Sequence, residues 1–405
     1  MTDKHVLPLA AAVAFSFFVW GVLGVLVGSI LPEVVAELSL SSFEAGLIFV
    51  VWSFGFAIGS AAAERLLRLA PAHRLLLVLS AATGVAALVQ AQAPTFAIFA
   101  GLYAALGLFG GAVFTASHTL FGALFPARRT SALGVLDLVF SGGNIVAPLL
   151  VVGLVAADAS WRVTFVVIGA AFLAGAIAFA FGGRAGVGRE AGGATAKPAA
   201  APTAARPRGR DGPPLIALAA GSFGLGATEW SQHVWFVTWA LAAGIDGAFA
   251  RIALAAFTAG MVAARVAAIA LGDRMRSALA VRLLLAAALA GHAAMLVAPG
   301  EATLLAANVA LGMGIGAMLP VFLGLAMDGD PARAATFSAV MVVSLTLGGQ
   351  VASFTVGTLA ELTDVRTAFP AAFGAVAIMA AGFESFRILS AHRRTASAAL
   401  AAREG

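Results

Sequence analysis

Residues 6–31 read VLPLAAAVAFSFFVWGVLGVLVGSIL, an apolar run of 26 residues that contains no charged side chain. A helix needs about 20 such residues to cross the roughly 30 Å hydrocarbon core of a bilayer. The run is too long for the apolar region of a signal peptide, and no clear small-residue cleavage site follows it. We therefore interpret it as a membrane-spanning helix.

The rest of the chain repeats this pattern. It is 61% hydrophobic and only 11% charged, with a mean hydropathy of +1.00. Such values are typical of a membrane protein. Backbone groups in lipid must be satisfied within each segment, and the runs are too long for the strands of a barrel. We expect an all-α bundle of twelve transmembrane helices, of which the other eleven lie near residues 43–63, 75–93, 96–122, 132–156, 163–182, 214–242, 250–271, 278–298, 302–327, 336–360 and 367–388.

The positive charges indicate a topology. When the loops are assigned to alternating sides, 20 of the 24 lysines and arginines fall on the side that holds both termini. By the positive-inside rule both termini are then cytoplasmic, and we expect a multi-pass protein of a bacterial inner membrane. The sequence pI of about 10.8 thus reflects topology and does not indicate a nucleic-acid partner. The chain has no cysteine, which excludes disulfides and thiolate metal sites.

We predict that the chain consists of two halves joined by a linker. Residues 183–213 are rich in Gly, Ala, Pro and Arg and lack apolar periodicity, which is typical of a flexible linker. They separate an N-terminal six-helix half, residues 1–182, from a C-terminal six-helix half, residues 214–405. Three motifs recur in order at offsets of 204 to 209 residues, and they are Glu64-Arg65 with Asp273-Arg274, Asn144 with Gln350, and Arg162 with Arg366.

In these features the chain resembles the major facilitator superfamily, whose twelve helices form two pseudo-symmetric halves. The acidic-basic pairs after the second and eighth runs resemble the signature loop of that superfamily, in a degenerate form. The resemblance implies that these loops latch one conformation of the transporter. The alternative is ordinary basic loops. The latch residues would be Glu64, Arg65, Asp273 and Arg274.

Four stretches are similar to the fucose/proton symporter-type branch of the superfamily. They read GATEWSQHVWFVTWAL, AARVAAIAL, GAMLPVFLGLAM and FPARRTSALGVLDLVFSGGNIVAP. This similarity implies uptake of a small, sugar-like solute driven by protons. The fucose symporters carry their proton-linked acids in the first and fourth helices, whereas those runs contain no central carboxylate in this chain. If coupling exists, it must use other residues.

Two carboxylates, Asp137 and Glu229, are the only acidic residues predicted inside the bilayer. Charged side chains at this depth are costly, so they normally face the bundle interior and serve a function. Asp137 shares a helical face with Ser141, Asn144 and Pro148. A carboxyl group in an apolar site can load and release a proton as access to water changes.

Glu229 shares a face with Gln232, His233 and Phe236 in the run LGATEWSQHVWFVTW, residues 225–239. Histidine titrates near neutrality and can relay a proton or bind a solute. Structural hydrogen bonding to a neighbouring helix is the competing interpretation for each group. The candidate proton-coupling residues are therefore Asp137, Glu229, His118 and His233.

Amides, aromatic rings and one arginine provide candidate substrate contacts. Amides offer directional hydrogen bonds, and tryptophans offer flat apolar walls. Polar packing between helices is the alternative for the amides, and an arginine two turns inside the membrane can instead extend to the interface. The set comprises Trp20, Trp52, Asn144, Gln232, Trp235, Asn308, Gln350 and Arg265.

The energy source must be a gradient. No GxxxxGK[ST] loop exists, and the only lysines are Lys4 and Lys197. No metal-ligating constellation or cofactor motif appears, so we expect neither an enzyme nor a bound cofactor. We predict a monomeric, proton-coupled secondary transporter that moves a small molecule by alternating access. Proton-antiport efflux of drugs or metabolites is the alternative, and a nontransporting membrane sensor is a more remote one.

Overall fold

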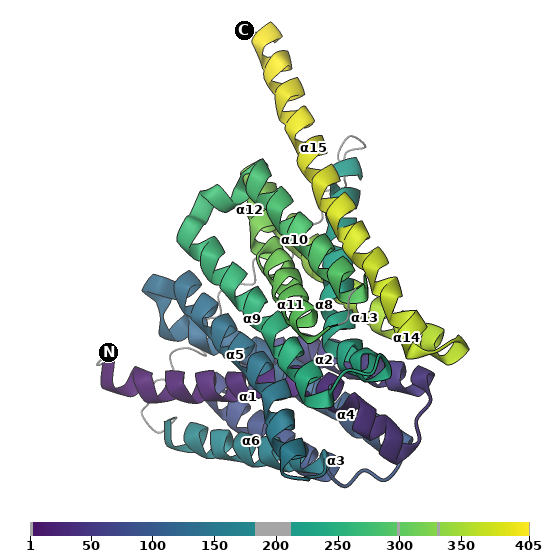
Figure 1. Cartoon of the computed structure of the whole chain (residues 1–405). Helices are drawn as coiled ribbons and strands as arrows, with labels where there is room; N and C mark the ends of the chain where they lie inside the picture. Colours follow the sequence, from purple (N-terminus) through teal and green to yellow (C-terminus); the bar gives the residue numbers. More distant parts are fainter. Residues whose placement is uncertain (1–2, 183–211, 298–299, 330–332, 405) are drawn as a thin grey trace. The chain divides into compact units, whose positions relative to one another are not determined.

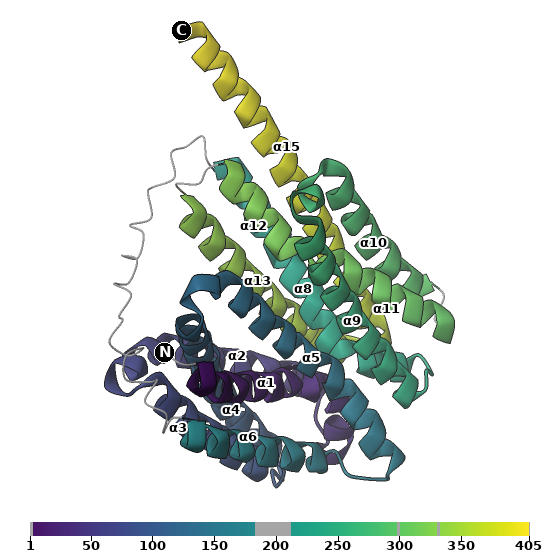
Figure 2. The ribbon, with the colours of Figure 1, turned by 90° about the vertical axis from the view of Figure 1, so that its left-hand side faces the viewer.

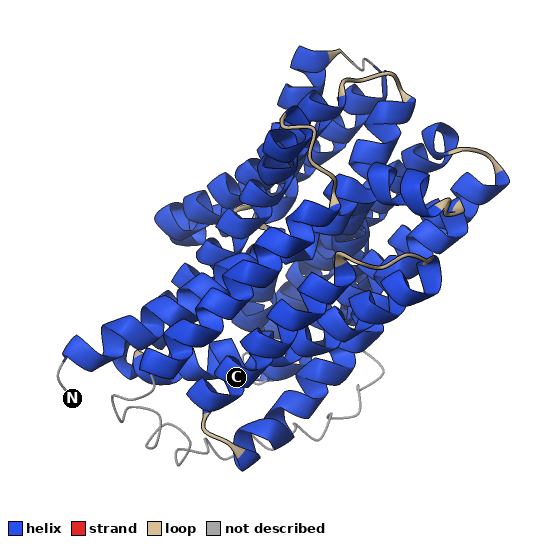
Figure 3. Cartoon of the chain, turned by 90° about the horizontal axis from the view of Figure 1, so that it is seen from below, coloured by secondary structure: helices blue, strands red, loops and turns tan. Residues whose placement is uncertain are grey.

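The computed structural model describes residues 3–182, 212–297, 300–329 and 333–404 of the chain. In these ranges every regular element is helical (Figure 3). The chain divides into two compact units, one comprising Met1–Lys197 with Asp246–Ala255 and the other Pro198–Ile245 with Ala256–Gly405. The predicted linker, apart from Gly212 and Pro213, lies outside the described residues.

The first unit is built from long α-helices joined by short turns (Figure 1). Its helices are α1 (Asp3–Leu38), α2 (Ser42–Leu69), α3 (Ala72–Gln90), α4 (Phe96–Leu124), α5 (Arg129–Ala156) and α6 (Arg162–Gly182), with the 3-10 turn η1 (Pro126–Arg128) before α5. Local sequence explains the start of α2. The Ser41 hydroxyl accepts from the Glu44 amide at 3.1 Å, and the Glu44 carboxylate accepts from the Ser41 amide at 3.0 Å. This capping box satisfies two amides that the helix itself cannot.

The second unit has the same character, and in it the long yellow helix α15 extends past the other helices (Figure 2). Its elements are α8 (Gly212–Ala242), α9 (Gly247–Leu271), η3 (Gly272–Arg276), α10 (Ala278–Val297), α11 (Glu301–Gly316), α12 (Met318–Gly329), α13 (Ala334–Leu362), α14 (Val365–Ala368), η5 (Phe369–Ala371) and α15 (Ala372–Glu404). The first residues of α9, Asp246–Ala255, belong to the first unit.

Helices occupy all twelve predicted runs. Eleven helical segments in the described ranges are long and apolar enough to cross a membrane. The remaining predicted run, 214–242, forms α8, which has 31 residues and is therefore also long enough to cross a membrane. It is less apolar because it carries Glu229, Gln232 and His233, the polar residues that the sequence had placed on one helical face.

Two of the predicted runs, 302–327 and 367–388, contain a short break in the structure. The first breaks at Ala317, between α11 and α12, and the second at η5. Proline explains both breaks, because it has no N–H to donate and its ring clashes with the carbonyl four residues back. Pro320 lies in the first turn of α12, and Pro370 lies in η5. Both runs are still long and apolar enough to cross a membrane, as the segments Glu301–Asp328 and Val365–His392.

Glycines bring α2 and α4 into backbone contact. A Cβ on Gly107 would lie 2.1 Å from the carbonyl oxygen of Trp52, and one on Gly111 would lie 2.0 Å from that of Phe56. No side chain fits at such distances, so the two helix backbones touch directly. Close crossings of this kind are a common way to pack helices in membranes, where burial of apolar surface gives little driving force.

The second unit repeats this crossing between α9 and α11. A Cβ on Gly312 would lie 2.0 Å from the Phe257 carbonyl oxygen, and one on Gly316 would lie 2.4 Å from that of Met261. Each of these residues stands 205 positions after its counterpart at the α2–α4 crossing. The internal repeat therefore exists in the packing as well as in the sequence.

The same spacing of 205 residues relates the α1–α5 crossing to the α8–α13 crossing. The glycine contacts there are Gly21 with Phe140, Gly143 with Phe18, Gly226 with Leu345 and Gly348 with Phe223. This constant register refines the sequence comparison. Asn144 corresponds to Gly349 by packing, and not to Gln350.

Arg162, at the start of α6, joins three segments of the first unit. Its Nε donates to a Glu37 carboxylate oxygen at 2.9 Å, and its two terminal nitrogens donate to the carbonyls of Ala91 and Ala93 at 2.8 and 3.0 Å. The guanidinium also lies over the Trp161 ring, 4.5 Å from its centroid. The planar fork of arginine suits such a divergent set of acceptors, which a single ammonium group cannot match.

We expect Arg162→Met to destabilise the protein by about 2–4 kcal/mol, because it removes the charged partner of Glu37 and leaves two loop carbonyls without their donor. Arg162→Lys should recover only part of this loss. Arg68→Ala is the matched control, since Arg68 forms an exposed pair with Glu64 on one helix and should change stability by less than about 0.5 kcal/mol. Thermal unfolding of the purified protein in detergent measures all three. Equal losses for Arg162→Met and Arg68→Ala would contradict the assignment.

Arg251 in α9 also joins segments of the first unit, and only 2% of its surface is exposed. Its Nε donates to the Ser29 carbonyl at 2.9 Å, Nη1 donates to the Gly247 carbonyl at 3.1 Å, and Nη2 contacts the Glu33 carboxylate. A buried guanidinium is tolerated only when its donors are paired. These contacts explain why the start of α9 groups with the first unit.

Candidate functional site

His118 and Asp137 form a direct polar contact inside the first unit. The Nε2 atom of His118, in α4, lies 3.1 Å from Oδ1 of Asp137, in α5. The imidazole is packed against two phenylalanines, with ring centroids 4.3 Å from Phe114 and 5.2 Å from Phe17. The histidine side chain is 24% exposed and the aspartate side chain 57%. The structure thus unites two of the four predicted proton-coupling residues.

The other ring nitrogen determines what this contact requires. Nδ1 of His118 lies 2.9 Å from the Phe114 carbonyl oxygen, which can only accept, so a hydrogen bond there needs a hydrogen on Nδ1. The contact with Asp137 then needs a further proton between Nε2 and Oδ1, held by either the imidazolium or the carboxylic acid. A neutral ring with its hydrogen on Nε2 keeps the bond to Asp137 and loses the bond to Phe114. Both hydrogen bonds therefore form at once only when the pair holds an added proton.

Glu229 and His233 lie together on α8 in the second unit. His233 donates from its ring to the Glu229 backbone carbonyl, and its Nε2 is 3.2 Å from the hydroxyl oxygen of Thr258 in α9. The Phe257 ring packs edge-on against the imidazole at 5.2 Å. Arg265, further along α9, donates from Nε to the Gly316 carbonyl oxygen at 3.2 Å. The predicted helical face of α8 thus contacts α9 through His233 and Thr258.

Gln232 and Asn308, both predicted to bind substrate, hydrogen bond to each other. Nε2 of Gln232 donates to Oδ1 of Asn308 at 2.6 Å, and Asn308 donates in turn to the Leu304 carbonyl at 2.9 Å. Both amides also contact the sulfur of Met295 in α10. The two side chains are 1% and 0% exposed. In this conformation they link α8, α10 and α11, and substrate binding by them stays a prediction.

The three tryptophans predicted to contact substrate are buried within their own units. Trp20 and Trp52 stack at 6.1 Å with an interplanar angle of 10°. Tyr103 continues the stack on Trp52 at 6.1 Å. In the second unit, Nε1 of Trp235 donates to the Ser353 carbonyl at 3.0 Å. These rings pack α1 on α2 and α4, and α8 on α13. Their contact with a solute stays a prediction.

The side chains of Asn144 and Gln350 each have a carbonyl oxygen that can still accept a hydrogen bond. Asn144 is buried and Gln350 is half-buried, and the side-chain carbonyl oxygen of each has no hydrogen-bond partner among the described residues. A buried amide oxygen without a partner is uncommon and costs free energy. Both therefore remain candidates for binding a solute or water.

The predicted latch residues lie at the ends of helices. Glu64 forms an exposed ion pair with Arg68 at 2.8 Å, and Asp273 lies 3.4 Å from Arg276, which also pairs with Asp328 at 2.6 Å. Each of these two acids thus pairs with an arginine three or four residues further along the chain. A latch that also uses Arg65 and Arg274 stays a prediction.

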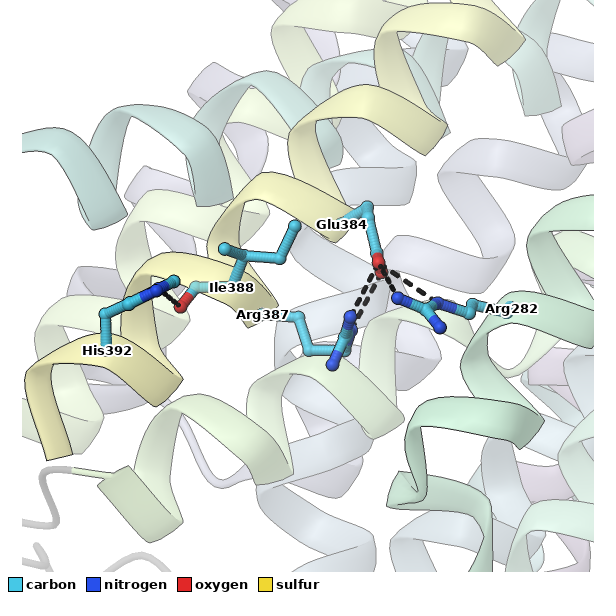
Figure 4. A network of polar contacts seen from close by, with 5 residues as sticks. All are labelled: Arg282, Glu384, Arg387, Ile388 and His392. Carbon is cyan, nitrogen blue, oxygen red and sulfur yellow. Dashed lines mark hydrogen bonds and ion pairs between the residues drawn. The ribbon is translucent and has the colours of Figure 1, made fainter. Parts of the chain in front are cut away.

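A separate ion network at one end of the second unit was not predicted. Figure 4 shows the Glu384 carboxylate of α15 between two guanidinium groups, Arg282 of α10 and Arg387 of α15. Arg282 donates at 2.8 Å and Arg387 at 2.6 Å. One acid thus ties α10 to α15 and leaves one net positive charge.

Sequence reasoning also missed the partner of His233. Thr258 stands seven residues before Arg265, which places both on one face of α9. That spacing was visible in the sequence and could have indicated a polar face opposite Glu229. No signal of this kind existed for Glu37 and Arg162, which come together only through the turns between helices.

Comparison with known proteins agrees with this arrangement. The sequence model of the Major Facilitator Superfamily matches residues 9–353. A search of curated proteins found no match. Among the described residues, no group of three or more His, Cys, Asp or Glu side chains is placed to hold a metal ion.

Solved transporters share the fold at low sequence identity. The nucleoside transporter NupG matches with a TM-score of 0.73 and 13% identity over 95% of this chain and 99% of that one. A bacterial homolog of the human lysosomal transporter Spinster, inward-facing and unoccupied, matches with 0.69 and 13% over 96% of both chains. The E. coli fucose:proton symporter FucP matches with 0.56 and 17% over 95% and 99%.

The predicted fold class, an all-α membrane protein with twelve transmembrane helices in two pseudo-symmetric halves, is thereby confirmed. The identities are too low to select one branch, so these likenesses show the fold alone. The match covers most of the chain, and with the repeated packing it places the protein in one family. The chain belongs to the Major Facilitator Superfamily and is a secondary transporter of small molecules, not an enzyme.

Proposed function

We propose that the protein couples the movement of a small polar solute to protons through the His118–Asp137 pair, by alternating access of a site to the two sides of the membrane. The observation that supports this is the pair of contacts of the His118 ring, 3.1 Å to Asp137 and 2.9 Å to the Phe114 carbonyl oxygen, which are both hydrogen bonds only when the pair holds an added proton. Loss of that proton leaves only one of the two bonds, and the side chains of His118 and Asp137 separate when the ring keeps its bond to Phe114. Proton release would thereby change a contact between α4 and α5.

The cargo we propose is uncharged and sugar-like, taken up together with protons. Four stretches similar to the fucose symporter-type branch support this class, together with the free amide oxygens of Asn144 and Gln350. A hydroxyl group of such a solute would donate to an amide oxygen of this kind. The same proposal includes a monomer in a bacterial inner membrane with both termini cytoplasmic, and halves at 1–182 and 214–405.

Proton-antiport efflux is a second candidate, favoured by the middle of α5. Pro148 lies inside this helix, and Gly143 contacts the backbone of Phe18 in α1. Pro148 also deprives the Asn144 carbonyl of its helical partner. A helix weakened in this way beside Asp137 suits a proton exchanger as well as a symporter.

The direction of proton movement distinguishes these functions. The protein is reconstituted into liposomes that contain a pH-sensitive dye, without a gradient, and fucose or uridine is added outside. Symport predicts acidification of the lumen on addition of the transported solute, because protons enter with it. Antiport predicts the opposite change on the same addition, a rise in the lumenal pH, because the solute enters in exchange for protons that leave.

Radiolabelled solute provides the control for proton movement. Uptake of label with no change in the lumenal pH would contradict proton coupling and would indicate that the protein is a uniporter. A nontransporting sensor would move neither label nor protons, although a bound ligand would still raise its melting temperature.

A further inference from the structure

The ion network around Glu384 contains one carboxylate and two guanidinium groups. Arg282 donates to Oε1 of Glu384 from Nε at 3.1 Å and from Nη2 at 2.8 Å. Arg387 donates from Nε to Oε2 at 2.8 Å and from Nη2 to Oε1 at 2.6 Å. Figure 4 shows both guanidinium groups directed at this one acid. Because arginine is always charged in proteins, the network has an excess of one positive charge.

Neighbouring elements do not supply the missing negative charge. Besides Glu384, the carboxylate side chains described at this end of the second unit are Asp273 of η3 and Asp328 of α12. Both pair with Arg276, at 3.4 and 2.6 Å. Helix α10 itself contains no carboxylate. The excess charge of the network is therefore available to an anion from outside the protein.

Arg282 lies near the level at which α10 leaves the membrane. The helix has 20 residues, about the number needed to cross the hydrocarbon core, and Arg282 is its fifth. At a rise of about 1.5 Å per residue it lies about 6 Å from the start of the helix. Its side chain is 60% exposed. A long basic side chain at this depth reaches the lipid headgroups, which carry the phosphates.

Exposed apolar side chains flank the two arginines. Leu279 and Leu283 of α10, which are 69% and 61% exposed, stand three residues before and one residue after Arg282. Ile388, which is 40% exposed, follows Arg387 on α15. A surface that combines exposed apolar side chains with an uncompensated positive charge fits an amphiphile with an anionic head.

The first unit shows that such a helix pair can pack without an ion network. Helices α3 and α6 are the third and sixth of that unit, and they pack on each other. Neither contains a carboxylate, so no ion pair can form between them. Holding α10 on α15 therefore does not by itself require two arginines.

We propose that Arg282 and Arg387 bind the phosphate group of an anionic phospholipid. The phosphate supplies the negative charge that Glu384 alone does not provide, and guanidinium groups form charge-assisted hydrogen bonds with phosphate oxygens. Basic pockets between membrane helices bind anionic headgroups in this way. The acyl chains of the lipid lie along Leu279 and Leu283. This site is separate from the His118–Asp137 pair and does not depend on the proposed proton coupling.

Binding of phosphatidylglycerol to the purified protein in detergent tests the proposal. Native mass spectrometry compares its apparent affinity with that of phosphatidylcholine, a zwitterionic lipid with the same acyl chains. We expect a preference of about tenfold for phosphatidylglycerol, and Arg282→Gln or Arg387→Gln should each lose most of it. Glu384→Gln should keep at least the natural preference, because it removes the carboxylate that competes with the phosphate.

Arg68→Gln is the matched control. The Arg68 side chain is 62% exposed and also pairs with a glutamate near the end of a helix, but that pair has no excess charge. This variant should keep the natural preference. Arg282→Gln leaves the pair of Arg387 with Glu384 on α15 in place, so loss of the whole network does not complicate its result.

Three results would overturn the inference. The first is an unchanged lipid preference in Arg282→Gln and Arg387→Gln, even with a lower melting temperature, because the network would then only tie α10 to α15. The second is loss of the preference in Glu384→Gln, which would show that the lipid does not compensate an excess charge. The third is stabilisation by soluble glycerol 3-phosphate equal to that by phosphatidylglycerol at the same concentration, which would indicate a site for a free phosphate compound.

Discussion

Asp137→Asn should abolish proton-driven accumulation while the protein still folds. The amide keeps the size and polarity of the side chain, which is 57% exposed, but it cannot share an added proton with His118. In proteoliposomes with an inward proton gradient, the accumulation ratio of a transported solute should fall to about one, the value reached without coupling. Exchange of labelled for unlabelled solute should persist, because it needs no net proton movement.

Matched variants separate this effect from a general loss of charge. Asp158→Asn removes an exposed carboxylate from the loop after α5 and should leave accumulation unchanged. His118→Gln removes the partner of Asp137 and should reproduce the loss. Full gradient-driven accumulation by Asp137→Asn would exclude this carboxyl group as the coupling site.

Glu229→Gln tests separately whether a residue of the second unit carries a coupled proton. If Glu229 also carries a coupled proton, this variant should lose accumulation and retain exchange in the same assay. Proton-coupled uptake at the natural level in both Asp137→Asn and Glu229→Gln would refute the coupling model as a whole.

Gly312→Ala should cost about 2–4 kcal/mol of stability, a large effect for the addition of one methyl group. The new Cβ would lie 2.0 Å from the Phe257 carbonyl oxygen, so α9 and α11 must separate. Gly107→Ala should behave alike at the equivalent crossing of α2 and α4, where the distance to the Trp52 carbonyl oxygen is 2.1 Å. Yield of monodisperse protein in detergent and its melting temperature measure the effect.

Gly101→Ala is the matched control, since Gly101 lies in α4 with no other segment within 4 Å of the added Cβ. Alanine at an open helical position should be neutral or stabilise by up to about 1 kcal/mol. If Gly312→Ala and Gly101→Ala melt alike, the backbone contact at the α9–α11 crossing does not exist as described.

The packing obeys the internal repeat, but the ionisable groups do not. At the spacing of 205 residues Asp137 corresponds to Val342, and Glu229 corresponds to Gly24. Glycines are repeated because two helices can cross closely in each unit only where one of the two residues in contact lacks a side chain. The functional groups occur once each, so the two units contribute different chemistry to one transporter.

The breaks in the helices could have been predicted more fully. Pro320 and Pro370 were visible in the sequence, and each removes a donor that a continuous helix needs. Hydropathy alone does not register this, because it counts apolar residues and ignores hydrogen bonds. Pro148 lies inside α5 without ending it, so proline position by itself does not determine where a helix stops.

The sequence by itself determined the class of protein, the approximate spans and the rare polar residues within them. Apolar length and the cost of unsatisfied backbone groups in lipid suffice for those conclusions, and both are local properties of the chain. The tertiary structure alone decided which side chains bond to each other. His118 bonds to Asp137, Gln232 bonds to Asn308, and Arg265 caps Gly316, because each contact depends on how two helices are rotated and spaced against each other. Residue type and helical period cannot supply that information, since they describe one helix at a time.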